Sequence, residues 1–397
     1  MHFRVIVNFV ISGVLAPTIW ALRDSEPLTL SIRANPRRDS NLSRGNSPSE
    51  SLQDWYRGTD LQWYGQLQVG TPPQNLTVVF DTGSSDVLIP SSQCNVTGCT
   101  KLLHRFDAKK STSFQDLHGP FYLAFSTGTD VSTTGDLTVE GTVVRDTVSV
   151  AGVSIENFQF ALITNQTAAF GDDPFDGIVG MGFNQGLTAG PQTLLEAINA
   201  TGSLKQALYG LYLTPNAVGH AEISFGSIDA SKTSGEVNYI PVYPTTGQFN
   251  GTFDKVFVNG ALLEIEPNYV IYDSGTANLV APKDDAEKIY AAISPDIKAI
   301  GDTGMYGIPC DRIKSLPATV TFTIGGQNYT IPSQELSVGQ LSDKPGVCQT
   351  LINASLPSKP GAKALWVIGG SLLKYYYTVW DIGNCRFGLA PTAQSPS

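Results

Sequence analysis

The chain has few basic residues and almost no histidine. Its 25 Lys and Arg residues are outnumbered by 35 Asp and Glu residues, which gives a net charge of −10. Because the basic residues form no stripe along the chain, binding to nucleic acid is not expected. The acidic balance fits a soluble protein that stays dispersed and that works in acid. The histidines form no zinc-binding helix motif, so we expect neither a metal site nor a cofactor; they are His2, His104, His118 and His220.

Several hydrolase and nucleotide-binding motifs are also missing. No Gly-x-Ser-x-Gly elbow occurs, which argues against a serine hydrolase of that type. The segment YDSGT around Asp273 is similar to the GDSGG of serine proteases, but no segment with a suitable histidine precedes it. The glycines of GMGFNQG lack the spacing of a dinucleotide-binding loop.

Apolar runs long enough to span a membrane are absent from the sequence. Residues 1–21, MHFRVIVNFVISGVLAPTIWA, predict a secretory signal peptide that is cut near Ala21. A membrane anchor is the alternative, but Asn8, Ser12 and Pro17 interrupt the short apolar run. The C-terminal APTAQSPS is polar and carries no lipid-anchor signal. We therefore expect no membrane anchor and a secreted, extracellular protein, with an acidic vacuolar compartment as the alternative location.

Asparagine sequons agree with export. Eight Asn-x-Ser/Thr patterns, together with the signal peptide, predict a glycosylated protein. They begin at Asn41, Asn75, Asn95, Asn165, Asn199, Asn250, Asn328 and Asn353.

Cysteine is scarce, with five residues in the chain. In an oxidising compartment Cys94 and Cys99 would close a small loop, and Cys310 and Cys348 would close a larger one. Cys385 would then have no partner. The sequence by itself leaves this pairing open.

The segment after the signal peptide differs from the rest of the chain. Residues 22–57 are short of apolar runs, slightly basic and rich in Ser, Arg, Asn and Pro. They predict a pro-segment removed on activation, with Arg37-Arg38 as a hypothetical processing site; a disordered linker fits the same composition.

The body of the chain is dense in strand patterns. Segments such as LTVVF, FQFALI, TVTFTI and YYYTVW carry β-branched and aromatic residues between Gly, Pro and Asn. Helical patterns are few, and the best are PQTLLEAINATG at 191–202 and KDDAEKIYAAI at 283–293. The sequence therefore predicts a mostly β protein.

Two halves of the body repeat the same pair of motifs. An apolar strand runs into Asp81 in VVFDTGSS, and another runs into Asp273 in YVIYDSGTAN. Gly180 of FDGIVGMG lies 99 residues after Asp81, and Gly369 of ALWVIGG lies 96 residues after Asp273. A single Asp-Thr-Gly could be an ordinary turn. A repeated pair of motifs at matching spacing indicates two related halves, with one aspartate in each.

From Gln62 to Pro391 the chain resembles the pepsin-type aspartic proteases. The segments YGQLQVGTPPQNLTVVFDTGSS, FDGIVGMGF, YDSGTANLVAP and YYYTVWDIGNCRFGLA follow the order of that family. The resemblance implies a bilobal fold of two pseudo-symmetric β-rich lobes, at 58–235 and 236–397, with a cleft between them. It also implies a monomer that hydrolyses proteins or peptides at acidic pH and is inhibited by pepstatin-type compounds.

The resemblance assigns Asp81 and Asp273 as the catalytic pair. Two carboxylates close together cannot both ionise cheaply, so the pair holds one proton between them in acid. The ionised member can then activate a water molecule, while the protonated member polarises the scissile carbonyl. Supporting roles follow from the resemblance for the residues after each aspartate: close approach of the loops for Gly83 and Gly275, hydrogen bonds between loops for Thr82 and Ser274, and hydroxyl donation to the carboxylates for Ser84 and Thr276.

The chain departs from the family in the region of the flap. Leu88 stands where the family usually has Trp, and Phe125 stands where the flap Tyr is expected. Because these two partners hydrogen-bond each other in the family, their joint replacement leaves no polar group without a partner. Tyr122 is the alternative flap residue. The altered flap keeps a second hypothesis open, a pepsin-like binding protein with weak or no activity.

Overall fold

The computed structural model describes residues 47–56, 59–125, 137–266, 269–341, 344–355 and 366–396. The predicted signal peptide at 1–21, residues 22–46 of the predicted pro-segment and the sequon at Asn41 lie outside the described residues.

The described residues are mostly β-strand, as the sequence predicts. The strands that precede residue 236 are β1 (Ser49–Tyr56), β2 (Asp60–Val69), β3 (Gln74–Asp81), β4 (Val87–Pro90), β5 (Gln115–Phe125), β6 (Leu137–Val150), β7 (Val153–Gln166), β8 (Gly177–Gly180), β9 (Leu208–Tyr212) and β10 (Ala221–Phe225). In β6 buried residues alternate with more exposed ones over most of its length, the pattern of a strand with one face on the core.

The strands of the second half are shorter. They are β11 (Asn238–Pro241), β12 (Asn250–Thr252), β13 (Lys255–Val258), β14 (Ala261–Leu262), β15 (Tyr269–Tyr272), β16 (Leu279–Pro282), β17 (Lys298–Ala299), β18 (Tyr306–Pro309), β19 (Val320–Ile324), β20 (Gln327–Ile331), β21 (Ser337–Gln340), β22 (Val347–Thr350), β23 (Ile352–Ser355), β24 (Trp366–Ile368), β25 (Tyr376–Asp381) and β26 (Arg386–Pro391).

Helices are short and few in the described part of the chain. They are α1 (Thr97–Thr100), α2 (Leu194–Ala200), α3 (Lys283–Ile293), α4 (Cys310–Ile313) and α5 (Gly370–Leu373), with 3-10 turns η1 (Ala108–Lys110), η2 (Ala168–Asp172), η3 (Asn184–Gly186), η4 (Ala230–Lys232) and η5 (Ser333–Leu336). The two predicted helices are α2 and α3. In α2 the Thr193 hydroxyl and the Glu196 carboxylate form a capping box, which satisfies amides that the first turn leaves without partners.

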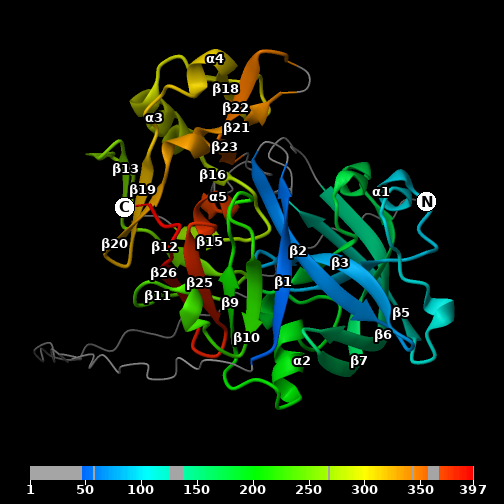
Figure 1. The fold of residues 1–397 in the computed structure, drawn as a ribbon. Coiled ribbons are helices and arrows are strands. Elements are labelled where there is room, and N and C mark those ends of the chain that lie inside the picture. The colour runs from blue at the N-terminus through cyan, green and yellow to red at the C-terminus, as the bar shows by residue number, and fades with distance from the viewer. Residues whose placement is uncertain are drawn as a thin grey trace, which may run out of the picture. The chain divides into compact units, whose positions relative to one another are not determined.

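One sheet of 13 strands contains strands from both halves. Its order is β11-β26-β25-β9-β10-β1-β2-β3-β8-β4-β7-β6-β5, and Figure 1 shows β25, β9, β10, β1 and β2 following one another across the centre of the view. The other sheets are β12-β15-β24-β16-β23, β14-β13-β19-β20 and β17-β18-β22-β21. The predicted mostly β fold class is thus confirmed.

The internal repeat seen in the sequence is also a repeat of strand pairing. In the first half β3 is parallel to β8, β8 is antiparallel to β4, and β4 is parallel to β7. In the second half β15 is parallel to β24, β24 is antiparallel to β16, and β16 is parallel to β23. The strands that lead into Asp81 and Asp273 therefore occupy equivalent places.

Strand β1 lies within residues 22–57, the range of the predicted pro-segment. It pairs with β10 on one side and with β2 on the other, both antiparallel. Leu52 and Trp55 point into the core. These eight residues are therefore an interior strand of the 13-stranded sheet.

A buried cluster of charges joins the two halves next to β1. The Lys374 ammonium donates to Asp60 Oδ2 at 2.5 Å and to Glu335 Oε2 at 2.7 Å. Tyr375 donates its hydroxyl to Glu335 Oε1 at 2.7 Å. Burial would raise the pKa of Asp60, but the Lys374 charge and the hydrogen bonds from Asp54, Lys374 and the Asn216 amide together hold that pKa below its usual value.

Asp54 of β1 lies beside this cluster, next to Asp60 and Lys374. As a carboxylate it would leave two buried oxygens without a donor. When protonated it can donate to Asp60 instead. Burial, followed by the hydrogen bond and charge of Asp60, raises the pKa of Asp54 to about 8.

Two disulfides close loops, one of them between fully buried cysteines. Cys94 is bonded to Cys99 and Cys310 to Cys348, with Cα–Cα distances of 5.8 Å and 4.9 Å, which are the pairs that the sequence suggested. Cys385 is an exposed free thiol.

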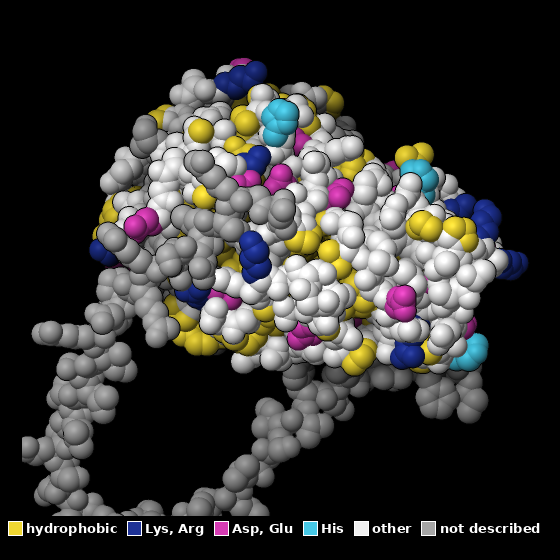
Figure 2. Space-filling view, turned by 60° about the horizontal axis from the view of Figure 1, so that its bottom comes forward, with side chains coloured by type: hydrophobic (Ala, Val, Ile, Leu, Met, Phe, Trp, Pro, Cys, Tyr) yellow, Lys and Arg dark blue, Asp and Glu magenta, His cyan; other side chains and the backbone are white. Residues whose placement is uncertain are grey.

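The surface carries scattered charges. On the face in Figure 2, acidic and basic side chains lie among neutral ones and gather into no large patch of one sign. Among the described residues, the helices are all too short or too polar to cross a bilayer.

Candidate active site

Asp81 ends a strand and Asp273 directly follows one, and each of these strands lies in the interior of its sheet. Asp81 is the last residue of β3, which lies between β2 and β8, and it pairs with Gly180. Asp273 follows β15 directly, and its amide donates to the Ile368 carbonyl of β24 at 3.0 Å. Because strands cover both sides of each, the aspartates are only 7% and 6% exposed.

The two loops that follow these aspartates lie against each other. A Cβ atom added to Gly83 would meet the Asp273 carboxylate carbon at 2.6 Å, and one added to Gly275 would meet Asp81 Oδ1 at 2.1 Å. Any side chain at either glycine would therefore force the loops apart. The structure brings together the two aspartates that the sequence singled out, although they are far apart in the chain.

Thr82 and Ser274 hydrogen-bond across the contact between the loops. The Ser274 amide donates to the Thr82 hydroxyl at 2.8 Å, and the Thr82 amide donates to the Ser274 hydroxyl at 3.2 Å. Each hydroxyl then donates to a carbonyl of the opposite strand, Thr82 to Tyr272 and Ser274 to Phe80. This reciprocal pairing is buried and makes the two loops one rigid unit.

Each carboxylate also receives donors from its own loop. Asp81 accepts from the Gly83 amide at 2.8 Å and from the Ser84 hydroxyl. Asp273 accepts from the Gly275 amide at 2.7 Å and from the Thr276 hydroxyl at 2.7 Å. These bonds orient both carboxylates and leave them facing each other.

The electrostatics of the pair favour a shared proton. Burial, and next the negative charge of Asp273, raise the pKa of Asp81 well above its usual value. The Ser84 and Gly83 donors lower it, but by less. Asp81 therefore keeps a proton at a pH where an exposed aspartate is ionised.

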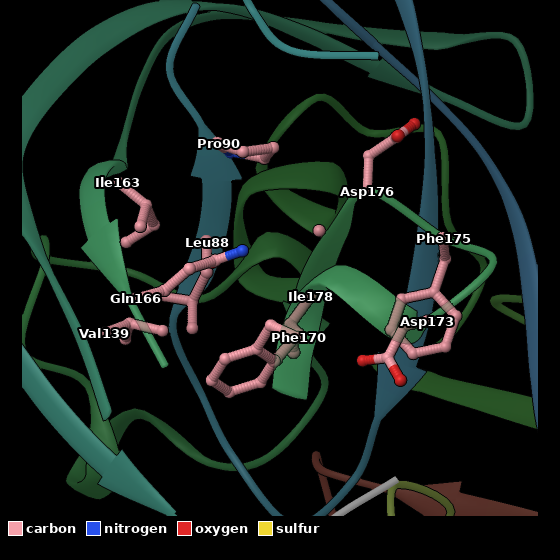
Figure 3. A pocket seen from close by; sticks show the side chains of 11 residues that line it. Leu88, Pro90, Val139, Ile163, Gln166, Phe170, Asp173, Phe175, Asp176 and Ile178 are labelled. Carbon is pink, nitrogen blue, oxygen red and sulfur yellow. The ribbon is translucent and has the colours of Figure 1, made fainter. Parts of the chain in front are cut away.

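A small, partly open pocket lies beside β3, the strand that carries Asp81. The side chains labelled in Figure 3 come from β4, β6, β7, β8 and the 170–176 segment, and most are apolar. They are Leu88, Pro90, Val139, Ile163, Gln166, Phe170, Asp173, Phe175, Asp176 and Ile178. In the pairing of β3 with β8, Ile178 lies opposite Val79, which is two residues before Asp81. This wall of the pocket therefore lies about 7 Å along the strand from the aspartate. The segment FDGIVGMG, which marks the internal repeat in the sequence, thus also contributes to a pocket that the sequence did not predict.

The predicted flap residues lie on the hairpin of β5 and β6. Phe125 is partly buried and its ring lies 6.1 Å from that of Phe170 in the pocket wall. Tyr122 is 61% exposed. Being three residues apart on one strand, the two side chains point to opposite faces. Residues 126–136, between the two strands, lie outside the described residues.

The remaining predicted sites lie elsewhere on the molecule. The sequon asparagines Asn75, Asn95, Asn165, Asn199 and Asn328 are exposed, whereas Asn250 and Asn353 are partly buried. The Asn250 amide nitrogen already donates to the Thr246 hydroxyl at 2.7 Å. In the described ranges no group of His, Cys, Asp and Glu side chains is arranged to hold a metal ion.

Comparison with known proteins gives consistent matches over this region. A family model described as eukaryotic aspartyl protease matches residues 62–392. The chain is 32% identical to cathepsin E-A of Xenopus laevis, over 89% of this chain and 84% of that protein. It is 31% identical to cathepsin E-B of the same organism, over 88% and 83%, and 31% identical to pepsin A of Suncus murinus, over 84% and 82%.

Proposed function

Because the chain belongs to the eukaryotic aspartyl protease family, and is thus an aspartic-type endopeptidase acting on peptide bonds, we propose that Asp81 and Asp273 are its catalytic pair. The observation that carries this assignment is the contact of each loop glycine with the opposite carboxylate. Two buried carboxyl groups in such contact hold one proton between them, which is the protonation state that hydrolysis by an activated water needs.

The proposed reaction uses both members of the pair at once. The ionised carboxylate takes a proton from a water molecule, whose oxygen attacks the scissile carbonyl carbon. The protonated carboxyl gives its proton to the carbonyl oxygen, and a tetrahedral diol forms. Collapse of the diol breaks the carbon–nitrogen bond as the amine nitrogen takes a proton, which releases two peptides and restores the pair. No bond forms between protein and substrate.

We assign the acidic optimum to the same pair. The raised pKa of Asp81 means that the shared proton is held in acid and lost as the pH rises. Activity therefore falls on the alkaline side, when both carboxyl groups are ionised.

The pocket beside Asp81 is the proposed site for one substrate side chain. Its walls are mainly Leu88, Ile163, Phe170 and Ile178, so an apolar side chain fits it best. Phe125 packs against the same wall through Phe170. We therefore assign Phe125, rather than the exposed Tyr122, as the residue of the flap hairpin that covers the substrate.

We propose that the protein is exported and glycosylated. The signal peptide, two disulfides and five exposed sequon asparagines support secretion, or delivery to an acidic compartment. Asn250 is expected to stay unmodified, because it is partly buried and its amide nitrogen donates to both the Tyr243 carbonyl and the Thr246 hydroxyl.

The first test is cleavage of denatured haemoglobin at low pH by the acid-treated protein, with and without pepstatin. Cleavage is expected, and pepstatin is expected to stop it. Asp81→Asn and Asp273→Asn should each lower the rate by a factor of about 1,000 or more, because the pair loses its shared proton or its base. Near-ultraviolet circular dichroism should stay unchanged.

Asp302→Asn is the matched control, since Asp302 is exposed at the surface and lies outside the segments that line the pocket. Its rate should equal that of the unmodified protein. Rapid, pepstatin-resistant cleavage by Asp81→Asn would show that another group does the chemistry.

A further inference from the structure

Two glutamine side chains reach the catalytic loops from the opposite half of the chain. Gln62 lies in β2, in the first half, and is fully buried. Its Nε2 donates to the carbonyl of Gly275 at 2.7 Å. Gly275 belongs to the loop of Asp273, in the second half. This contact spans 213 residues of sequence.

Gln248 makes the converse contact. It precedes β12 in the second half, and its Nε2 donates to the carbonyl of Gly83 at 3.1 Å. Gly83 belongs to the loop of Asp81. The next residue, Phe249, is fully buried, with its ring 4.7 Å from Trp380 and 4.6 Å from Phe183. That packing fixes the backbone from which Gln248 extends.

The two contacts form a crossed arrangement with a shared geometry. Each glycine donates its amide to the aspartate of its own loop, at 2.8 Å for Gly83 and 2.7 Å for Gly275. Each glycine also accepts, at its carbonyl, from a glutamine of the other half. A glycine has no side chain to limit its rotation, so hydrogen bonds on both sides of it are what fix its peptide groups.

These bonds differ from the pairing of Thr82 with Ser274. That pairing acts on the residue next to each aspartate and uses its amide. The glutamines act one residue further along and use the carbonyl. The loops are thus held at two successive peptide groups.

We propose that Gln62 and Gln248 are positioning residues that clamp the two glycine peptides and so keep the Asp81 and Asp273 carboxyl groups in register for catalysis. The proposal rests on the catalytic assignment of that pair. Neither glutamine takes part in proton transfer. Loss of either amide lets one loop turn, which moves a carboxyl group relative to the scissile bond and lowers kcat more than it raises KM.

Gln62 also allows a test of the clamp that depends on pH. Its Oε1 is buried and has no hydrogen-bond partner among the described residues. The Gln62 amide therefore holds the loop through its nitrogen, which donates to the Gly275 carbonyl. In Gln62→Glu a protonated carboxyl can donate to the Gly275 carbonyl, whereas an ionised one repels it. The clamp should therefore be present in acid and lost as the new carboxyl group ionises.

The experiment measures kcat and KM on a peptide substrate, across pH, for Gln62→Met, Gln248→Met and Gln62→Glu. Each Met variant keeps the side-chain length but has no amide donor. We expect kcat to fall by about 10-fold or more in each, with KM changed by less than about 3-fold. Gln62→Glu should approach the unmodified kcat at the lowest pH and lose it at a lower pH than the unmodified protein does.

Gln74→Met is the matched control, because the Gln74 amide also donates to a main-chain carbonyl, that of Asp107, away from the site. It should leave kcat unchanged. Unchanged kcat in both clamp variants, an effect on KM alone, or a Gln62→Glu profile parallel to that of the unmodified protein would each overturn the proposal.

Asp81→Asn in the same series separates this proposal from the catalytic assignment. If that variant is inactive and the glutamine variants are fully active, only the clamp is wrong. If Asp81→Asn is active, the catalytic assignment fails and the clamp fails with it. Should a Met variant not fold, the pH profile of Gln62→Glu decides.

Discussion

At the scale of single residues, two missing side chains set the distance between two charges. Gly83 and Gly275 each lie so close to the opposite carboxylate that one added carbon atom would overlap it. In the proposed mechanism, this short distance makes the aspartates share a proton instead of titrating apart. Glycine is therefore needed here for close approach, whereas neither residue requires a left-handed backbone.

Gly275→Ala tests this close approach. The new Cβ would stand 2.1 Å from Asp81 Oδ1, so the loops must separate and the shared proton is lost. We expect kcat/KM to fall by about 100-fold or more, with little change in the far-ultraviolet circular dichroism spectrum. In the control Gly119→Ala the new Cβ meets only the Val143 side chain, at 3.3 Å, and activity should persist. An active Gly275→Ala enzyme would mean that the loops do not need this contact.

Sequence reasoning at this scale succeeds where a pattern is local. Asp81 and Asp273 are each followed by a hydroxyl residue and then a glycine, and the repetition of this tripeptide makes both copies recognisable in the sequence. Gln62 and Gln248 have no such signal. They precede their half's aspartate by 19 and 25 residues, in segments with no common motif, so only the folded chain relates them.

At the scale of elements, the strands around Asp81 also build the pocket. β8 pairs with β3 through residues that include Asp81, and with β4 through Leu88. If the pocket holds a substrate side chain as proposed, a substitution in β4 alters substrate choice without touching the proposed catalytic pair. Leu88 is the informative residue, because the family usually carries a larger side chain there.

Leu88→Trp should narrow the pocket. For a series of peptides that differ in one side chain next to the cleaved bond, we expect kcat/KM to fall by about 10-fold or more for large apolar side chains and to change little for alanine. Leu88→Met, which nearly conserves volume, is the control and should keep the original preference. An equal loss for all peptides would indicate damage to the fold rather than a filled pocket.

Elements with clear end signals are predicted well, and those without are not. The acidic first turn of KDDAEKIYAAI predicts α3 at its observed bounds. β1 is different, because SESLQDWY is polar and has only two buried apolar side chains, Leu52 and Trp55. Its place is decided by β10 and β2, which pair with it, so local pattern assigned it to the leader.

At the scale of the whole molecule, the halves are joined by a sheet and by buried charge. β1 and β2 of the first half face Lys374 and Glu335 of the second through Asp54 and Asp60. Strand order across the halves and a cluster of this kind depend on long-range contacts, which periodicity and composition do not encode. The repeat of two halves was visible in sequence, but their common sheet was not.

Asp54 should make the protein more stable in acid. Its pKa is about 8 in the folded protein, compared with an ordinary value of 3.8 in an unfolded chain. Between these values the folded protein holds one proton more, so the free energy of unfolding falls as the pH rises from about 4 to about 8. Below about pH 4 the contribution of Asp54 is complete. The groups that face it are Asp60, Lys374 and Tyr64.

Urea unfolding of the unmodified protein and of Asp54→Asn, at several pH values in this range, checks the expectation. The difference in free energy of unfolding should shift in favour of Asp54→Asn as the pH rises, because the variant has no proton to lose. Asp172→Asn, at an exposed position, should follow the unmodified protein. A difference that is constant with pH would show that Asp54 is ionised throughout.

The position of β1 between two other strands limits how the N-terminus is trimmed. A cut after Tyr56 would excise a strand from the interior of the sheet and leave β10 and β2 with two unsatisfied edges. Any trimming of the N-terminus that keeps this strand in the sheet must therefore stop upstream of Ser49, and a cut at the hypothetical processing site Arg37-Arg38 would meet that condition.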